Sequence, residues 1–206
     1  MLDTSEDLNT CAAEIGCDVE QLLTPLTRFT RQHPEAYFAI DNGAYSKFNA
    51  TEFLSLLERE KDYKSLCRFV AVPDVVGSAR RTLEVFERWQ YKLHGWPLAL
   101  VAQNGLQDLE IPWDSIEAIF IGGDTEWKLG EHARNVIKAA KALGKWVHAG
   151  RVNTPARFEY FESLGADSID GTGLSRFSWM RERIYRQARQ PNLLRGDGEI
   201  AEALVL

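Results

Sequence analysis

Three aspartates each come shortly after a short apolar stretch of the sequence. They are Asp41 after residues 37–40, Asp74 after residues 69–72 and Asp170 after residues 166–169. Two carboxyl groups in one site can divide into a nucleophile and a general acid or base when their surroundings push their pKa values apart. Attack at an anomeric carbon uses such a pair, because a carboxylate stabilises an oxocarbenium-like transition state. Each aspartate alone is also explained as a turn residue or a helix cap, so the prediction depends on their convergence.

Further residues that follow apolar stretches indicate a flat, polar ligand. Gln103 presents both a donor and an acceptor, which suits the edge of a nucleobase. Gly122 and Gly123 allow a flat ligand to approach the backbone closely, and Tyr45 can stack on it. The structural alternatives are a solvated loop for Gln103, a tight turn for the glycines and a core-edge position for Tyr45. His148 ends another apolar stretch, where packing or a hydrogen bond explains it as readily as a role in the site.

One stretch near the C-terminus is strongly basic, although the chain carries a formal net charge of −6 and a pI near 5.3. That acidity argues against a protein that coats nucleic acid nonspecifically. Six arginines stand in residues 176–195 against one acid, Glu182: Arg176, Arg181, Arg183, Arg186, Arg189 and Arg195. With Trp179 and Tyr185 among them, this stretch can bind a phosphate backbone, or it can be the solvated face of a helix.

Strand-like and helix-like patterns alternate along the chain, which predicts an α/β protein with a parallel sheet. Six strand–helix units are recognisable, with strands near residues 37–40, 69–72, 98–102, 118–121, 146–149 and 166–169. Each strand ends in polar or glycine residues, and in a (β/α) barrel these ends meet on the face that holds the active site. We therefore expect a small TIM-barrel-like fold, irregular or incomplete, with residues 24–27 and 203–206 as candidates for further strands. A doubly wound sheet is the alternative, although its site uses fewer strand ends.

Length and composition limit the class of protein. With 206 residues, 45% of them hydrophobic, the chain can form one domain with its own core. We expect a variable N-terminal segment at 1–20 and a single barrel-like catalytic domain with a basic C-terminal helix at 21–206. No apolar run is long enough to span a membrane, and the N-terminus lacks the features of a signal peptide, so we expect a cytoplasmic protein. The three cysteines make no disulfide framework, the four histidines show no ligand spacing, and neither a metal nor a cofactor is expected.

In their order along the chain, these strand ends resemble the motifs of the tRNA-guanine transglycosylase superfamily over roughly residues 22–178. Residues 41–45 resemble its Asp-Ser-Gly-Gly-Tyr/Phe segment, 72–74 its Phe-Asp-Glu segment, 101–105 its Ile-Val-Gln-Gly-Gly segment, 121–123 its Gly-Gly, 147–152 its Leu-Met-Gly-Val-Gly segment, 165–170 its Gly-Val-Asp-Met-Phe-Asp segment, and 175–176 the end of its Pro-Thr-Arg. The resemblance implies that Asp170 is the nucleophile and that Asp41 is the general acid and base. It implies a substrate-binding set of Tyr45, Asp74, Gln103, Gly122, Gly123, His148 and Gly150. It also implies that Arg176 contacts the nucleic acid, and the basic stretch adds Arg181, Arg183 and Arg186 as predicted nucleic-acid-binding residues.

The chain also departs from that superfamily. The C-terminal zinc segment is absent, and the segment after Gly123 is longer, so either Glu126 or Glu131 could take the place of a base-binding glutamate. The small size of the chain and the sequence of residues 146–153 resemble the phage and bacterial branch that acts on DNA. That branch exchanges guanine for a 7-deazaguanine such as 7-cyano-7-deazaguanine.

The resemblance therefore implies a pentosyltransferase that exchanges guanine in DNA, located in the cytoplasm, or in the host cytoplasm if the protein is phage-encoded. Such an enzyme needs no metal or cofactor, and a protein partner is possible. Three alternatives stay open: a transglycosylase that acts on tRNA, a catalytically silent nucleic-acid-binding subunit of a modification complex, and a barrel enzyme for a small sugar or nucleoside.

Overall fold

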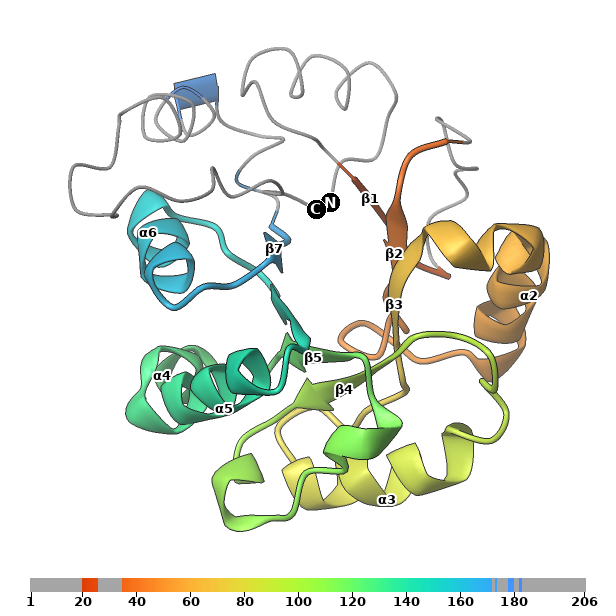
Figure 1. The fold of residues 1–206 in the computed structure, drawn as a ribbon, viewed down its shortest axis with the longest axis horizontal. Coiled ribbons are helices and arrows are strands. Elements are labelled where there is room, and N and C mark those ends of the chain that lie inside the picture. The colour runs from red at the N-terminus through yellow and green to blue at the C-terminus, as the bar shows by residue number, and fades with distance from the viewer. Residues whose placement is uncertain (1–19, 26–34, 172, 174–177, 180–181, 183–206) are drawn as a thin grey trace.

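Seven parallel strands form one sheet in the computed structural model, which describes residues 20–25, 35–171, 173, 178–179 and 182. The strands are β1 (Gln21–Leu23), β2 (Phe38–Ile40), β3 (Cys67–Ala71), β4 (Leu98–Ala102), β5 (Ala118–Ile121), β6 (Trp146–Ala149) and β7 (Ser168–Ile169). Each strand pairs with the next one along the chain. The sheet curls into a half-barrel with the helices on its outer side (Figure 1).

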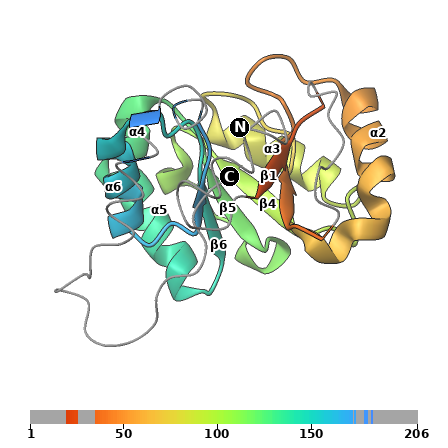
Figure 2. The same cartoon turned by 90° about the horizontal axis from the view of Figure 1, so that it is seen from above.

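The connections between the strands are mostly helical. The α-helices are α2 (Ala50–Glu60), α3 (Ala79–Trp89), α4 (Thr125–Leu129), α5 (Glu131–Ala142) and α6 (Pro155–Ser163), and the 3₁₀ turns are η1 (Lys61–Leu66), η2 (Leu106–Asp108) and η3 (Trp113–Ser115). Asn49, Asp124 and Thr154 begin α2, α4 and α6 by accepting backbone N–H groups of the first helical turn. In Figure 2, α2 and α6 lie on opposite sides of the strands.

The predicted α/β class with a parallel sheet is confirmed, but the predicted strand and helix pattern needs three corrections. A seventh strand, β1, lies just before the candidate at 24–27. The fully described connection from β4 to β5 contains the short turns η2 and η3 and no α-helix. The short helix α4 was not expected. The strand order has no reversal among the described strands, which excludes the doubly wound alternative.

Two cores hold the half-barrel together. Between the sheet and the helices lies the larger core, to which α2, α3, α5 and α6 contribute Phe53, Phe86, Ile137 and Phe158. On the concave side lies a smaller core of Leu22, Ala39, Phe69, Ala99 and Ala118. Because successive side chains of a strand point to opposite faces, both faces of the strands are buried and the strands read as continuous apolar runs.

Arg68 lies near the amino ends of the strands. Its guanidinium lies 3.6 Å from the ring centroid of Tyr37 and 4.9 Å from that of Trp146. It also forms an ion pair with the buried Glu20 at 2.7 Å. The polar strand ends are at the opposite, carboxyl edge. Among the described residues, no helix combines the length and the apolar character that crossing a bilayer requires.

Candidate active site

The carboxyl ends of the strands surround a pocket of about 510 Å³. Such ends converge when a parallel sheet curls. Residues that the sequence predicts to react or to bind line this pocket: Asp41, Tyr45, Asp74, Gln103, Gly122 and Asp170. They come from the ends of β2, β3, β4, β5 and β7. The pocket is therefore the candidate active site.

Fixed hydrogen-bond donors hold the carboxylate of Asp170, which directly follows β7. Its Oδ1 accepts a hydrogen bond from the backbone N–H of Arg151 at 2.8 Å, and its Oδ2 lies 3.1 Å from Nε2 of His148. Burial by itself raises the pKa of Asp170, but the hydrogen bond from His148, helped by the Arg151 amide, outweighs it. The pKa therefore lies below its ordinary value, and Asp170 is ionised at neutral pH, as a carboxylate nucleophile must be.

Asp41 follows β2 and faces the same pocket in surroundings that disfavour charge. Its Oδ1 accepts a long hydrogen bond, 3.3 Å, from the backbone N–H of Gly43. Burial, and after it the negative charge of Asp170, raise the pKa of Asp41 from 3.8 to about 7. Asp41 can thus hold a proton near neutral pH, which a general acid requires. The surroundings push the two carboxyl pKa values in opposite directions.

Two side-chain amides hold Asp74. Nδ2 of Asn42 donates to its Oδ1 at 2.9 Å, and Nε2 of Gln103 donates to its Oδ2 at 2.7 Å. The backbone N–H groups of Gly77 and Gly123 both donate to Oε1 of Gln103, which turns the amide nitrogen toward Asp74. Burial raises the pKa of Asp74, although both amides lower it. The Gln103 oxygen is thus taken by the backbone, and Gln103 serves the pocket by orienting Asp74.

Arg151 lines the pocket and was not among the predicted site residues. It follows β6 with φ 58°, the one positive φ among the described non-glycine residues. This backbone turns its N–H toward Asp170. Its guanidinium donates to the carbonyl oxygen of Gly123 at 2.8 Å and lies 4.2 Å from the ring centroid of Tyr45. Arg151 therefore links the ends of β5 and β6 to the loop after β2.

The predicted glycines are sites of close packing. A Cβ atom on Gly122 would lie 2.9 Å from the carbonyl oxygen of Ala102, and one on Gly150 would lie 2.6 Å from the ring of Phe120. Gly123 has φ 72°, a conformation that glycine adopts without strain. Gly122 lines the pocket, whereas neither Gly123 nor Gly150 is part of its lining.

His148 is completely buried. Its imidazole touches Asp170 instead of the pocket, which corrects the prediction that it binds the substrate directly. Glu126 and Glu131 are exposed and do not line the pocket, so neither takes the place of a base-binding glutamate. The predicted nucleic-acid-binding residues lie outside the described residues: Arg176, Arg181, Arg183 and Arg186.

Lys128 in α4 is a buried cation close to the site. Its Nζ donates to the carbonyl oxygen of Gly150 at 2.6 Å. Burial, and after it the charge of Arg151, lower the pKa of Lys128 to about 8. No sequence pattern indicated this position, because a lysine in a short helix is ordinarily exposed. Its positive charge favours the ionised form of Asp170.

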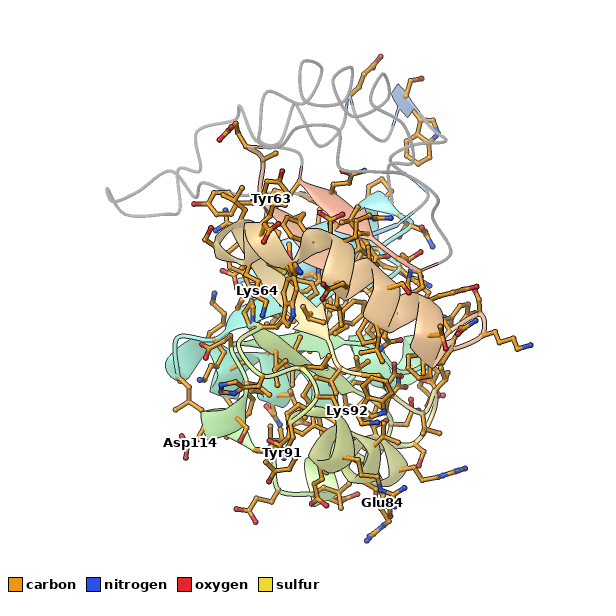
Figure 3. The ribbon with its side chains drawn as sticks, turned by 90° about the vertical axis from the view of Figure 1, so that its right-hand side faces the viewer. Tyr63, Lys64, Glu84, Tyr91, Lys92 and Asp114 are labelled. Atoms are coloured by element: carbon orange, nitrogen blue, oxygen red, sulfur yellow. The ribbon has the colours of Figure 1, made fainter. Side chains whose placement is uncertain are left out.

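A second cavity, of about 340 Å³, lies beside the segment after α3. Tyr91, which lines it, and the neighbouring Lys92 are labelled on that side of the molecule in Figure 3. Glu117 is the one carboxyl group in its lining, so it lacks the paired acids of the first pocket. Among the described residues, no group of three or more histidine, cysteine, aspartate and glutamate side chains is arranged to hold a metal ion.

No protein-family model and no curated protein matches the sequence. A solved structure described as a PaMucR phosphodiesterase in complex with c-di-GMP is similar, with a TM-score of 0.40 and 16% sequence identity. The similarity covers 70% of this chain and 63% of that chain. It is too low to indicate what this chain binds or does.

Proposed function

We propose that this chain is a base-exchange glycosyltransferase that replaces guanine in DNA with a 7-deazaguanine base. The observation that carries the proposal is the pairing of Asp170 and Asp41 in one pocket, with opposite pKa displacements and with Tyr45 and Asp74 beside them. Such a pair supplies the nucleophile and the general acid that a double displacement at an anomeric carbon needs.

In the first displacement, a carboxylate oxygen of Asp170 attacks C1′ of the target deoxyguanosine. The C1′–N9 bond breaks, the departing guanine takes a proton from Asp41, and a glycosyl ester joins C1′ to Asp170. The pKa of about 7 allows Asp41 to carry this proton at neutral pH. The hydrogen bonds to Asp170 keep it unprotonated and oriented for attack.

In the second displacement, the incoming 7-deazaguanine returns the proton. Asp41, now ionised, removes the N9 proton while N9 attacks C1′, and the ester bond to Asp170 breaks. Both acids end in their starting states. The steps balance without a metal ion or a redox cofactor.

Base recognition follows from the orientation of Asp74. Asn42 and Gln103 each donate to a different oxygen of Asp74, so each oxygen keeps a lone pair that can accept an N–H group of a base edge in the pocket. The ring of Tyr45 supplies a stacking surface at the pocket, which Gly122 also lines.

The substrate and the complete fold are parts of the same proposal. The target base must leave the helical stack to enter a pocket, so we expect a flipped base or single-stranded DNA. We propose that the curled sheet belongs to a TIM-barrel-like fold of the guanine transglycosylase type, that the basic stretch at 176–195 binds phosphates, and that the protein acts in the cytoplasm of a bacterium or of a phage host.

Covalent trapping tests the reaction. Purified protein is incubated with guanine-containing DNA or with tRNA, with and without 7-cyano-7-deazaguanine, and separated on a denaturing gel. We expect a shifted band with DNA that disappears in Asp170→Asn and that added deazaguanine turns over. Asp167→Asn is a matched control, since that aspartate pairs with Lys141 outside the pocket.

The other outcomes are equally specific. A band with tRNA alone keeps the chemistry and contradicts the DNA assignment. Binding of DNA without a band, at every pH between about 5 and 9, contradicts the catalytic proposal and favours a silent subunit or a missing protein partner. A band that persists in Asp170→Asn refutes the choice of nucleophile.

A further inference from the structure

We propose that a chain of hydrogen bonds from Trp146 through Ser168 fixes the tautomer of His148 and makes His148 the positioning residue for Asp170. The inference rests on the proposed role of Asp170 as nucleophile. The bonds themselves are independent of that role: Nε1 of Trp146 lies 2.8 Å from Oγ of Ser168, and the same oxygen lies 2.8 Å from Nδ1 of His148. Nε2 of His148 lies 3.1 Å from Oδ2 of Asp170.

The strand register brings these four residues together. β6 and β7 are parallel, with His148 opposite Ser168. Alternate residues of a strand face the same side, so Trp146 and His148 project from one face of β6 and Ser168 and Asp170 continue the same face on the neighbouring strand. The series of hydrogen bonds therefore alternates between the two strands, from Trp146 at the start of β6 to Asp170 directly after β7.

The indole of Trp146 sets the direction of the chain. An indole N–H can only donate, so the Ser168 oxygen must accept from it. The Ser168 hydroxyl hydrogen then needs another acceptor, and His148 is the other partner of this oxygen among the described residues. Nδ1 of His148 thus accepts, its proton sits on Nε2, and Nε2 donates to Asp170.

The surroundings leave the chain little freedom to rearrange. Ser168 and His148 are buried, so water cannot replace their partners easily. The imidazole lies 4.5 Å from the ring centroid of Phe120 and 5.1 Å from that of Phe69, which restricts its rotation. The imidazole therefore presents a fixed donor to the carboxylate.

Both oxygens of Asp170 then have a directed donor, His148 on Oδ2 and the Arg151 amide on Oδ1. Among the described residues, the charges of Asp41 at the end of β2 and of Lys128 in α4 also act on Asp170. The two donors fix the rotation of the carboxylate. We infer that this presents it to C1′ in a single orientation.

Nitrogen NMR of ¹⁵N-histidine-labelled protein tests the tautomer without any need for catalysis. The His148 signals are assigned by their loss in His148→Gln. We expect a neutral imidazole protonated on Nε2 in the native chain near neutral pH. An Nδ1-protonated ring or a doubly protonated ring would overturn the inference.

The Asp170→Asn variant tests whether the Asp170 carboxylate, and not the hydrogen bonds from Trp146 through Ser168, selects the tautomer of His148. An asparagine amide can donate or accept, so it imposes no preference on Nε2. We expect the Nε2–H tautomer to persist in Asp170→Asn and to shift about fivefold or more toward Nδ1–H when Trp146→Phe is added. Trp96→Phe in the same background is the matched control and should change nothing. A mixture already present in Asp170→Asn contradicts the proposal.

The rate of covalent trapping provides a second test of the proposal. We expect Trp146→Phe and Ser168→Ala each to slow the covalent trapping step by about two- to fivefold, through a less populated donor to Asp170. Unchanged trapping rates in both variants would show that the tautomer does not matter to the reaction. If the native protein forms no covalent complex at all, the proposed function fails. The NMR spectrum still tests the tautomer of His148 in that case.

Discussion

At the scale of single residues, Asp41 and Asp170 have the same side chain and acquire different chemistry from their neighbours. Asp170 has donors on both oxygens, which stabilise the ionised form. Asp41 has a long hydrogen bond to the Gly43 amide and faces the charge of Asp170. Of the two carboxyl groups, Asp41 is therefore the one that holds a proton near neutral pH, and the proposed roles of acid and nucleophile follow from this difference.

This assignment predicts how Asp41 affects stability. Its pKa is about 7 in the folded chain against 3.8 as the reference value, so between these two pH values the folded state binds the extra proton. Stability attributable to Asp41 is therefore fully present below about pH 4 and is lost as the pH rises through about 7. Asp41→Asn removes that loss. We therefore expect the free energy of unfolding of the variant, relative to that of the native chain, to rise by on the order of 2–4 kcal/mol from about pH 4.5 to pH 8.

Urea unfolding at a series of pH values measures this difference. The Asp41→Asn variant should also be inactive in trapping, because it can no longer supply or accept the proton. Asp114→Asn, in the exposed turn η3, removes a carboxyl group away from the pocket and serves as the control. An advantage of Asp41→Asn that does not change with pH would mean that Asp41 is ionised in the folded chain throughout.

At the scale of elements, the turn after β6 controls two features of the pocket. The positive φ of Arg151 aims its amide at Asp170, and its side chain reaches Gly123 and Tyr45. A glycine at this position keeps the backbone conformation and removes the guanidinium. An alanine removes the same side chain but retains the steric cost of the left-handed conformation.

The pair Arg151→Gly and Arg151→Ala therefore separates backbone from side chain. We expect Arg151→Gly to be about 0.5–1 kcal/mol more stable than Arg151→Ala in urea unfolding, since the strain outweighs the extra entropy of glycine in the unfolded chain. Both variants should show the same weakened binding of the base, because neither keeps a guanidinium beside the ring of Tyr45. Equal stability of the two would mean that the turn relaxes and that the amide does not need this φ.

Sequence patterns predicted the strands better than the connections between them. β2 to β7 are buried on both faces and read as apolar runs followed by polar residues. β1 has only three residues and begins with Gln21, so its pairing with β2 defines it more than its composition does. The short helix α4 depends on the cap at Asp124, which in the sequence resembles a turn residue after two glycines.

The same distinction applies to the site. Asp41, Gln103, Gly122 and Asp170 directly follow their strands, so the rule for strand ends finds them. Arg151 also lies at a strand end, but that rule does not reveal its role, which comes from a backbone conformation that arginine rarely adopts. The alternation of side chains along a strand indicates that His148 points inward. Its partners on β7 depend on the register between the two strands, which the sequence pattern does not give.

At the scale of the whole molecule, the half-barrel has stabilising contacts near the amino ends of its strands and the candidate active site at their carboxyl ends. Near the amino ends of the strands, Arg68 pairs with Glu20 and stacks on Tyr37. At the carboxyl ends, the pocket gathers three aspartates, Asp41, Asp74 and Asp170, in a chain whose net charge is already −6. Arg151 is the one cation among the described residues that line this pocket, so a DNA-acting enzyme of this composition needs a separate cationic region to hold the phosphates.

The arginines of residues 176–195 are the candidates for that region, which makes their contribution measurable through salt. We expect Arg181→Gln, Arg183→Gln and Arg186→Gln together to weaken binding of a single-stranded oligonucleotide, measured by fluorescence anisotropy. For each phosphate that the variant no longer neutralises, the slope of log affinity against log salt should become shallower by roughly 0.9 on a duplex and about 0.7 on a single strand. Arg80, Arg81 and Arg88 belong to α3, and their replacement by glutamine removes the same charge elsewhere.

The matched triple variants distinguish a local contact from an effect of net charge. If both sets flatten the slope equally, the basic stretch attracts DNA only through the overall field of the protein. If neither set changes binding or trapping, the phosphate backbone is not recognised, and an enzyme for a free nucleoside or sugar becomes the better interpretation of the same aspartate pair. A change confined to Arg181, Arg183 and Arg186 would favour a polynucleotide substrate, because those arginines would then hold the strand from which a base enters the pocket.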